Sequence, residues 1–328
     1  MNEFTRRDAV KLLALAVPGM AVANQAFAQS PWPTRSVRVL MGFSAGGGAD
    51  SMTRPVMQYA STALGQTMVV ENRTGGNTVV AAGAVLQLPP DGYVLFVNGL
   101  QHVVNPFLMS DLPFDYTKSF VPVSQMCRYP ETFAVNVNAP WKTMQELVEY
   151  ARANPNKIRY GTANVGGMGH IQMELLKAKQ GVQMVNVPYT SAPDIATDVA
   201  GGRLDMSVLT ASTVGPMLRA GKVRLLAVGN DTRAKLFPDV PTMAEVGYPE
   251  ANLSDWSGMF VPVGTPNDVI RKVQATLAAA AKDRAVLDRI EPQGTELVCS
   301  TPEEFSAFLD AQRKAVKYAI DTAHITLN

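Results

Sequence analysis

Two glycine-rich turns constrain the fold of this sequence more than any other feature. The first, FSAGGGAD at 43–50, directly follows the apolar segment 37–41, and the second, NVGGMG at 164–169, follows the apolar segment 158–161. A helical pattern begins at the end of each turn. Glycine permits a tight turn and places no Cβ between backbone amides and a ligand, and a helix start presents free N–H groups. The sequence therefore predicts either two plain strand-to-helix turns or two anion sites, one in each half of the chain.

Short apolar segments alternate with helical patterns along the chain, which is typical of α/β sheets covered by helices on both faces. We predict strands at 37–41, 68–71, 93–97, 133–137, 158–161, 184–187, 206–209 and 223–228. We predict helices at about 49–64, 79–88, 144–154, 170–180, 267–281 and 302–321, with Thr143 and two Thr-Pro pairs marking starts.

The chain is too long for one ordinary core, so we predict two α/β lobes. Each lobe would be a mainly parallel sheet flanked by helices, and two crossover segments near 123–128 and 255–261 would join them. Lobe 1 would comprise residues 31–126 plus 258–328, and lobe 2 would comprise residues 127–257.

The N-terminus has the pattern of a secretory signal peptide over residues 1–28. Arg6, Arg7 and Lys11 precede an apolar run at 12–23, and Ala-Phe-Ala at 26–28 offers a cleavage site. The paired arginines are also similar to a twin-arginine export signal. We therefore expect export to the periplasm; a cytoplasmic protein with a chance apolar N-terminus is the alternative. No later apolar run reaches the roughly 18 residues of a membrane helix.

Charge and metal-binding residues exclude several classes of function. The chain has 29 basic and 28 acidic residues, and the predicted signal holds three of the former and two of the latter, so the mature protein is balanced. Nucleic-acid binding needs a basic surface, so we expect no nucleic-acid partner. The three histidines show no metal-ligand spacing, and we expect no metal and no cofactor. Cys127 and Cys299 either pair in an oxidising compartment or act as small core residues.

Two enzyme interpretations compete for the first glycine turn. GFSAG at 42–46 fits the serine nucleophile motif, with Ser44 as the nucleophile and His170 or His324 as the later base. The motif follows the first predicted strand of the mature chain, however, where such hydrolases have not yet built their sheet. A dinucleotide-binding motif fails because its third glycine falls on Ser51. We predict a binding protein, not an enzyme, with a secreted hydrolase using Ser44 as the alternative.

The mature chain resembles the Bug-type periplasmic binding proteins of tripartite tricarboxylate transporters along essentially its whole length. The resemblance rests on the order and spacing of FSAGGGAD (43–50), VENR (70–73), PDGY (90–93), NP (105–106), VPY (187–189), GGRLD (201–205), AGKVR (220–224), FPDVPT (237–242), WSG (256–258) and PVGTP (262–266). It implies a two-lobed periplasmic binding protein (Venus-flytrap) fold whose lobes close on a small carboxylate.

The resemblance also implies which residues hold the ligand, largely through backbone amides. Lobe 1 would bind the ligand through Ser44, Gly46, Gly47, Ala49 and Asp50. Lobe 2 would bind it through Asn164, Gly166, Gly167, Met168, Gly169 and His170. Gln101, His102 and Tyr189 would line the cleft. Asp50 would repel an anion unless it caps the helix or meets an amine on the ligand.

Departures from the family pattern suggest a particular ligand. Gly167, Met168 and Gly169 replace residues that are commonly Thr or Ser, and Leu209 and Thr210 replace a frequent Asp-Asn pair. A cleft with Met168 and Leu209 favours an apolar-bodied ligand, such as an aromatic mono- or dicarboxylate, over citrate or an amino acid. Neutral drift outside the contact shell is the alternative explanation.

The predicted function is therefore capture of a small carboxylate by a monomeric receptor that delivers it to the membrane subunits of a secondary transporter. A ligand sensor that presents its closed form to a signalling partner would use the same closure, so both roles fit the sequence.

Overall fold

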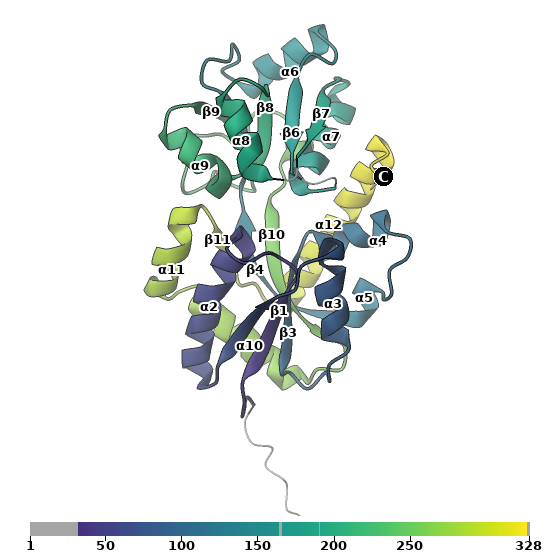
Figure 1. Cartoon of the computed structure of the whole chain (residues 1–328), viewed down its shortest axis with the longest axis vertical. Helices are drawn as coiled ribbons and strands as arrows, with labels where there is room; N and C mark the ends of the chain where they lie inside the picture. The colour runs from purple at the N-terminus through teal and green to yellow at the C-terminus, as the bar shows by residue number, and fades with distance from the viewer. Residues whose placement is uncertain (1–31, 164–165, 190, 327–328) are drawn as a thin grey trace, which may run out of the picture.

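The structure, a computed structural model, describes residues 32–163, 166–189 and 191–326, and the predicted signal peptide lies outside these residues. Two β-sheets lie end to end along the long axis of the molecule (Figure 1). Sheet A has the order β11-β4-β10-β3-β1-β2 and contains β1 (Val37–Met41), β2 (Met68–Asn72), β3 (Val94–Gly99), β4 (Phe120–Tyr129), β10 (Asp255–Pro262) and β11 (Glu296–Leu297). Sheet B has the order β7-β6-β8-β5-β9 and contains β5 (Glu131–Asn136), β6 (Arg159–Thr162), β7 (Val185–Pro188), β8 (Met206–Thr210) and β9 (Val223–Gly229). The predicted two-lobed α/β fold is confirmed.

Both sheets are mixed rather than mainly parallel, which corrects the prediction. β1 pairs in parallel with β2 and β3, and β6 pairs in parallel with β7 and β8. β10 and β5, by contrast, run antiparallel to both of their neighbours. The physical reason is that these two strands receive the chain from the other sheet, whereas parallel neighbours need a crossover helix on the same sheet.

The two predicted crossover segments lie side by side. They belong to β4 and β10, which pair from Asp255 opposite Tyr129 to Pro262 opposite Phe120. The chain leaves sheet A after Tyr129, passes through Pro130 into β5, and returns to sheet A at Asp255. The lobe boundaries proposed from the sequence thus fall a few residues inside these strands.

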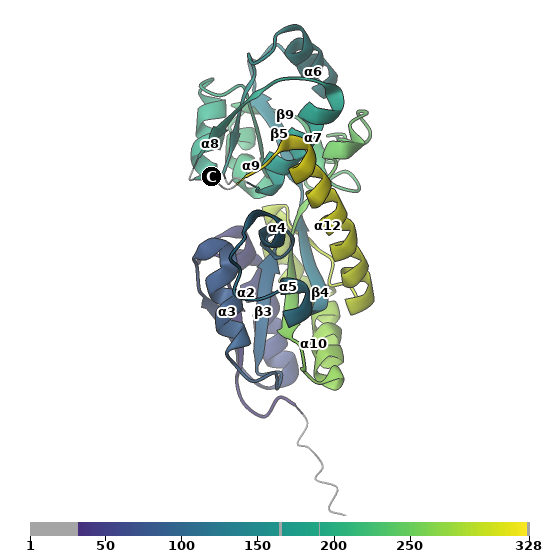
Figure 2. The same cartoon turned by 90° about the vertical axis from the view of Figure 1, so that its right-hand side faces the viewer.

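Helices cover both sheets (Figures 1 and 2). Around sheet A lie α2 (Gly48–Leu64), α3 (Val79–Leu86), α4 (Gln101–Leu108), α5 (Tyr116–Ser119), α10 (Asn267–Ala280), α11 (Arg284–Ile290) and α12 (Pro302–Ala323). Around sheet B lie α6 (Met144–Ala153), α7 (Met168–Gln180), α8 (Ala192–Ala200) and α9 (Ala211–Arg219). Five short helices were not predicted from the sequence: α4, α5, α8, α9 and α11. Two of them, α4 and α9, also contain a proline. The predicted Thr143 cap is present, since its side chain accepts a hydrogen bond from the Glu146 N–H.

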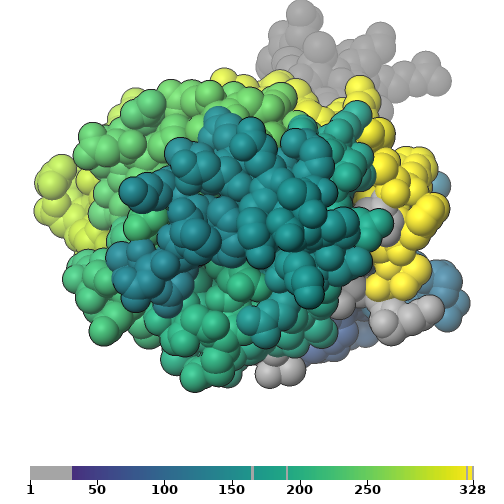
Figure 3. All heavy atoms as spheres, turned by 90° about the horizontal axis from the view of Figure 1, so that it is seen from above, coloured from purple at the N-terminus to yellow at the C-terminus, as the bar shows by residue number. Residues whose placement is uncertain are grey.

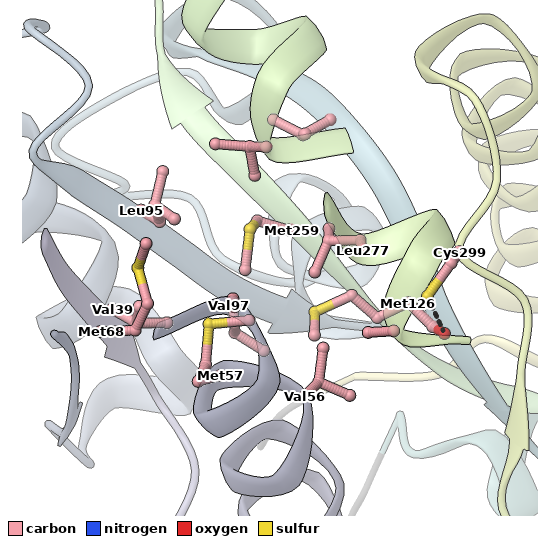
Figure 4. Packing of buried hydrophobic residues seen from close by; sticks show 14 of the residues in the cluster. Val39, Val56, Met57, Met68, Leu95, Val97, Met126, Met259, Leu277 and Cys299 are labelled. Atoms are coloured by element: carbon pink, nitrogen blue, oxygen red, sulfur yellow. Dashed lines mark hydrogen bonds between the residues drawn. The ribbon is translucent and has the colours of Figure 1, made fainter. Parts of the chain in front are cut away.

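Sheet A separates two apolar clusters. On one face, Val39 and Met259 pack with Met57 of α2 and Leu277 of α10 (Figure 4). On the other face, a cluster around Phe96 and Phe260 includes residues of α4 and α12. This second cluster also contains Met168, Ile171 and Leu175 of α7, a helix that belongs to sheet B. One apolar core therefore contains residues of both lobes.

The C-terminal helix α12 makes the same connection along the outside. Thr301 and Glu304 form a capping box at its start, next to the predicted Thr-Pro pair. The helix contacts β4 and α4 at one end and α7 at the other, and its yellow C-terminal residues lie against the teal lobe in the view from above (Figures 2 and 3). Near that end, Lys179 Nζ lies 4.7 Å from the centroid of the Tyr318 ring.

Cys127 and Cys299 are separate buried thiols, and burial raises the pKa of each to about 12. The Cys299 Sγ lies 3.6 Å from the carbonyl oxygen of Met126 (Figure 4). Over the described residues, no helix is both long and apolar enough to cross a membrane. The same part of the chain holds no group of three or more His, Cys, Asp or Glu side chains placed to bind a metal ion.

The packing of α12 on β10 gives a direct test of the fold. A Cβ added at Gly258 would lie 2.2 Å from Cζ of Phe305, which is itself fully buried. We expect Gly258→Ala to lower the free energy of unfolding by about 1–3 kcal/mol, because the α12 contact becomes overpacked. The control is Gly83→Ala in α3, where the nearest atom is 3.8 Å away and alanine favours the helix. Equal urea denaturation midpoints for the two variants would contradict this packing.

Candidate functional site

The two glycine-rich turns have the same backbone conformation. Gly46 and Gly166 have φ of 77° and 73°, in the left-handed region that favours glycine. The next residues, Gly47 and Gly167, are extended, with φ/ψ of −72°/171° and −70°/163°, and form the N-caps of α2 and α7. A glycine N-cap has no side chain to accept from the N–H groups of the first helical turn. Both helices therefore begin with donors that suit an anion.

A side chain from the first turn of each helix reaches back to hold the preceding loop. The Gly46 N–H donates to Asp50 Oδ2 at 2.9 Å, and the Gly166 N–H donates to His170 Nδ1 at 3.1 Å. Because Nδ1 accepts this bond, the proton of the neutral imidazole lies on Nε2. Burial lowers the pKa of His170, although Glu174, 3.7 Å from Nε2, opposes the shift. Asp50 and His170 thus have equivalent positions in the two turns.

Asp50 is the centre of a hydrogen-bonded network that orders the first turn. It is 4% exposed, and it accepts at 2.9 Å from Arg54 Nε and at 2.9 Å from Asn72 Nδ2. Asn72 also donates to the carbonyl oxygen of Phe43. Burial would raise the pKa of the Asp50 carboxyl, but the bonds from Arg54, Gly46 and Asn72 outweigh it and lower the pKa. Asp50 therefore supports the turn instead of facing a ligand.

Two adjoining cavities lie where the sheets meet. One, of about 140 Å³, is lined by Gly167, Met168 and Gly169 of the second turn. The other, of about 190 Å³, is lined by Gly48 and Ala49 of the first turn. Both cavities share four residues, which are Gln101, Thr210, Thr213 and Asp255. The two helix starts therefore border neighbouring cavities that share part of their lining, and these two cavities together are called the gap.

The structure brings most, but not all, of the predicted site residues to this gap. Gln101 and Ala49 line the cavity beside the first turn, and the cavity beside the second turn is lined by Gln101, Gly167, Met168, Gly169, His170 and Leu209. Other predicted residues are not among those that line the two cavities: Ser44, Gly46, Gly47, Asp50 and Gly166 form the turns, and the Tyr189 hydroxyl donates a hydrogen bond to Asp198. Asn164 lies outside the described residues.

The structure corrects the expected position of His102. Its ring is 2% exposed and stacks on Phe260 with centroids 4.0 Å apart, and Tyr116 and Phe120 meet it edge-on. Burial lowers the pKa of His102 to about 3, so the imidazole is neutral. The reason is that α4 begins at Gln101, and its first turn directs His102 into the core of sheet A.

Two acidic residues and several hydroxyl groups that line the gap were not among the predicted site residues. Glu131 and Asp255 both line the cavity beside the second turn, together with Thr162, Thr210 and Thr213. Glu131 and Asp255 are the first residues of β5 and β10, the strands on which the chain enters each sheet. This position could have been used to predict them as site residues, because both crossover segments connect the two sheets and so pass the gap.

Ser44 does not have the surroundings of a nucleophile. It is exposed, and its carbonyl oxygen accepts from the Gly47 N–H at 3.3 Å. Within the described residues no hydrogen bond joins Ser44 to a histidine. The hydroxyl thus lacks the adjacent base that activates a serine.

Two α/β lobes that place two helix starts on a shared gap define a periplasmic binding protein. The chain belongs to the tripartite tricarboxylate transporter family receptors (TctC), whose sequence pattern matches residues 52–324. A UPF0065 protein of Bordetella bronchiseptica is 32% identical over 315 residues, which cover 96% of this chain and 91% of that protein. The family is one of transport receptors, so the chain is a binding protein and the Ser44 hydrolase interpretation is wrong.

Solved structures give the same assignment. The structure of the periplasmic binding protein BugD has a TM-score of 0.74 and 28% identity, covering 90% of this chain and 99% of its own. The structure of Rpa4515 of R. palustris with adipate has a TM-score of 0.78 and 29% identity, with the same coverage of 90% and 99%. The predicted membership of the Bug-type receptors is confirmed.

The network around Asp50 predicts how the first turn responds to substitution. We expect Asp50→Asn to lower the free energy of unfolding by about 1–3 kcal/mol, because the buried bonds to Arg54 and Gly46 lose their charge. Folding lowers the pKa of Asp50, so its contribution is present above the unfolded value of about 3.9 and is lost as the pH falls through the folded value. Urea titrations at neutral and acidic pH measure both effects. The exposed Asp239→Asn is the control, and equal losses in the two variants would refute the network's role.

Proposed function

We propose that the protein captures a small carboxylate in the periplasm and presents it to the membrane subunits of a tripartite transporter. The observation that carries the proposal is the meeting of two glycine-capped helix starts at one gap. Each start offers backbone donors and a positive dipole end, worth about 0.3–2 kcal/mol for an anion. The adipate in the related Rpa4515 structure supports a carboxylate as the ligand class.

The lining of the gap supports an apolar body for this ligand. Met168, Val208 and Leu209 line the cavity beside the second turn. A cavity of about 140 Å³ is close to one that holds a benzene ring, which has been engineered at about 150 Å³. We therefore propose an aromatic mono- or dicarboxylate in preference to citrate or glutamate, which have no apolar ring to pack on Met168 and Leu209. Export through the twin-arginine route is part of the same proposal.

A thermal-shift screen tests the ligand class. We expect benzoate, nicotinate or terephthalate to raise the melting temperature, since a ligand at a hundred times its Kd stabilises the native state by about 2.7 kcal/mol. Citrate and glutamate should leave it unchanged. Tight citrate binding with no aromatic binding would contradict the apolar body, and no shift with any carboxylate, adipate included, would contradict the function.

A pair of substitutions at Gly48 tests whether the α2 amides hold the ligand. Gly48 is the first residue of α2 and follows the extended Gly47, a position that accepts proline without strain. Gly48→Pro removes one N–H, whereas Gly48→Ala keeps it, and an added Cβ has its nearest neighbour at 4.0 Å. We expect the proline variant to lose about tenfold or more in affinity for the carboxylate that gives the largest thermal shift.

Calorimetry compares the two variants with the wild-type protein and with Ser44→Ala. Alanine at position 48 or 44 should keep most of the affinity, because both leave every backbone donor in place. Equal affinity of Gly48→Pro and Gly48→Ala would mean that the first turn does not hold the ligand.

A further inference from the structure

Two carboxyl groups line the gap that is proposed to bind an anion, although a carboxylate would repel an anionic ligand. Glu131 and Asp255 both line the cavity beside the second turn, and Asp255 also lines the adjoining cavity. No lysine or arginine is among the described residues that line either cavity. The two acids therefore face the gap without a cation beside them.

Glu131 is buried with an unused oxygen. Its side chain is 4% exposed, and Oε2 has no hydrogen-bond partner among the described residues. Its backbone is paired on both sides in sheet B, with Thr210 of β8 and with Gly229 of β9. A buried polar atom without a partner costs about 1–3 kcal/mol, so such atoms usually serve a ligand, a water or an ion.

Burial acts on both acids. Burial, reinforced by the charge of Asp255, raises the pKa of Glu131 well above its usual value. Burial also raises the pKa of Asp255, to about 6, although the Trp256 N–H donates to its Oδ1 at 2.8 Å. Asp255 is then mostly ionised at pH 7. The pair therefore presents the Asp255 charge and the unpartnered Glu131 oxygen to the gap.

We propose that Glu131 and Asp255 bind a hydrogen-bond donor of the ligand, an amine or a hydroxyl, at a distance from the carboxylate that the helix starts hold. This rests on the proposed function and narrows it, because the ligand becomes an apolar-bodied monocarboxylate with a donor group. A second carboxylate at this end would lie beside the Asp255 charge and would be repelled. An amine or hydroxyl would instead satisfy the unused Glu131 oxygen.

Two ligand series with matched skeletons test the proposal by calorimetry. The aromatic series is benzoate, para-hydroxybenzoate, para-(aminomethyl)benzoate and terephthalate, and the aliphatic series is hexanoate, ε-aminocaproate and adipate. We expect, in at least one series, a donor-bearing member to bind about tenfold or more tightly than the unsubstituted carboxylate, and the dicarboxylate to bind more weakly. Comparison of the hydroxyl-bearing ligand with the amine-bearing ligands shows whether the site prefers a neutral donor or a cation.

Isosteric variants assign the effect to the two acids. Asp255→Asn and Glu131→Gln should each reduce the preference for the amine-bearing ligand by about tenfold, and Asp255→Asn should improve binding of the dicarboxylate. The asparagine side chain at position 255 keeps an oxygen that can accept from the Trp256 N–H, and unliganded thermal unfolding checks that both variants fold. The matched control is Glu149→Gln on the exposed face of α6, which should change no affinity.

The possible failures are distinct. If the unsubstituted carboxylates or the dicarboxylates bind best and the variants leave the order unchanged, the donor site is overturned while the carboxylate receptor stands. If no member of either series binds, both proposals fail.

Discussion

The site depends on the left-handed conformation of Gly46 and Gly166. In each turn this conformation carries the chain from a parallel strand into an extended glycine and then directly into a helix. The turn is kept in place by a residue of the helix itself, Asp50 in one lobe and His170 in the other, which accepts from the left-handed glycine's own N–H. The first-turn amides are thereby left pointing at the gap, where an anion can take them.

The second turn also couples the site to the contact between the lobes. Met168 lines the gap and at the same time packs in the apolar core that α7 shares with α4 and α12. A Cβ at Gly166 would lie 2.8 Å from a methyl carbon of Leu108 on α4, so this turn fits closely against the other lobe. If the proposed ligand contacts Met168, it would favour the arrangement in which α7 meets α4 and α12, as expected of a receptor that closes about a hinge.

Local features of the sequence predicted the two glycine-rich turns. The remaining parts of the site depend on helix starts and on the pairing of strands that are far apart in the chain. Glycine and strand patterns act within a few residues, so the strand–turn–helix units and the Thr143 cap were predictable. His102 was misplaced because the start of α4 at Gln101 was not foreseen, and one helical turn directs that ring onto Phe260. Glu131 and Asp255 were missed because the pairing of β5 with β8 and of β10 with β4 joins residues far apart in the chain.

The central claim is that one carboxylate is held by the starts of both α2 and α7. Amide chemical shifts of Gly48 and Gly169, followed by NMR during titration with the carboxylate that binds best, measure this most directly. Both amides should shift with one common dissociation constant, because the two helix starts bind the same molecule. A shift at only one of them, or two different dissociation constants, would contradict it.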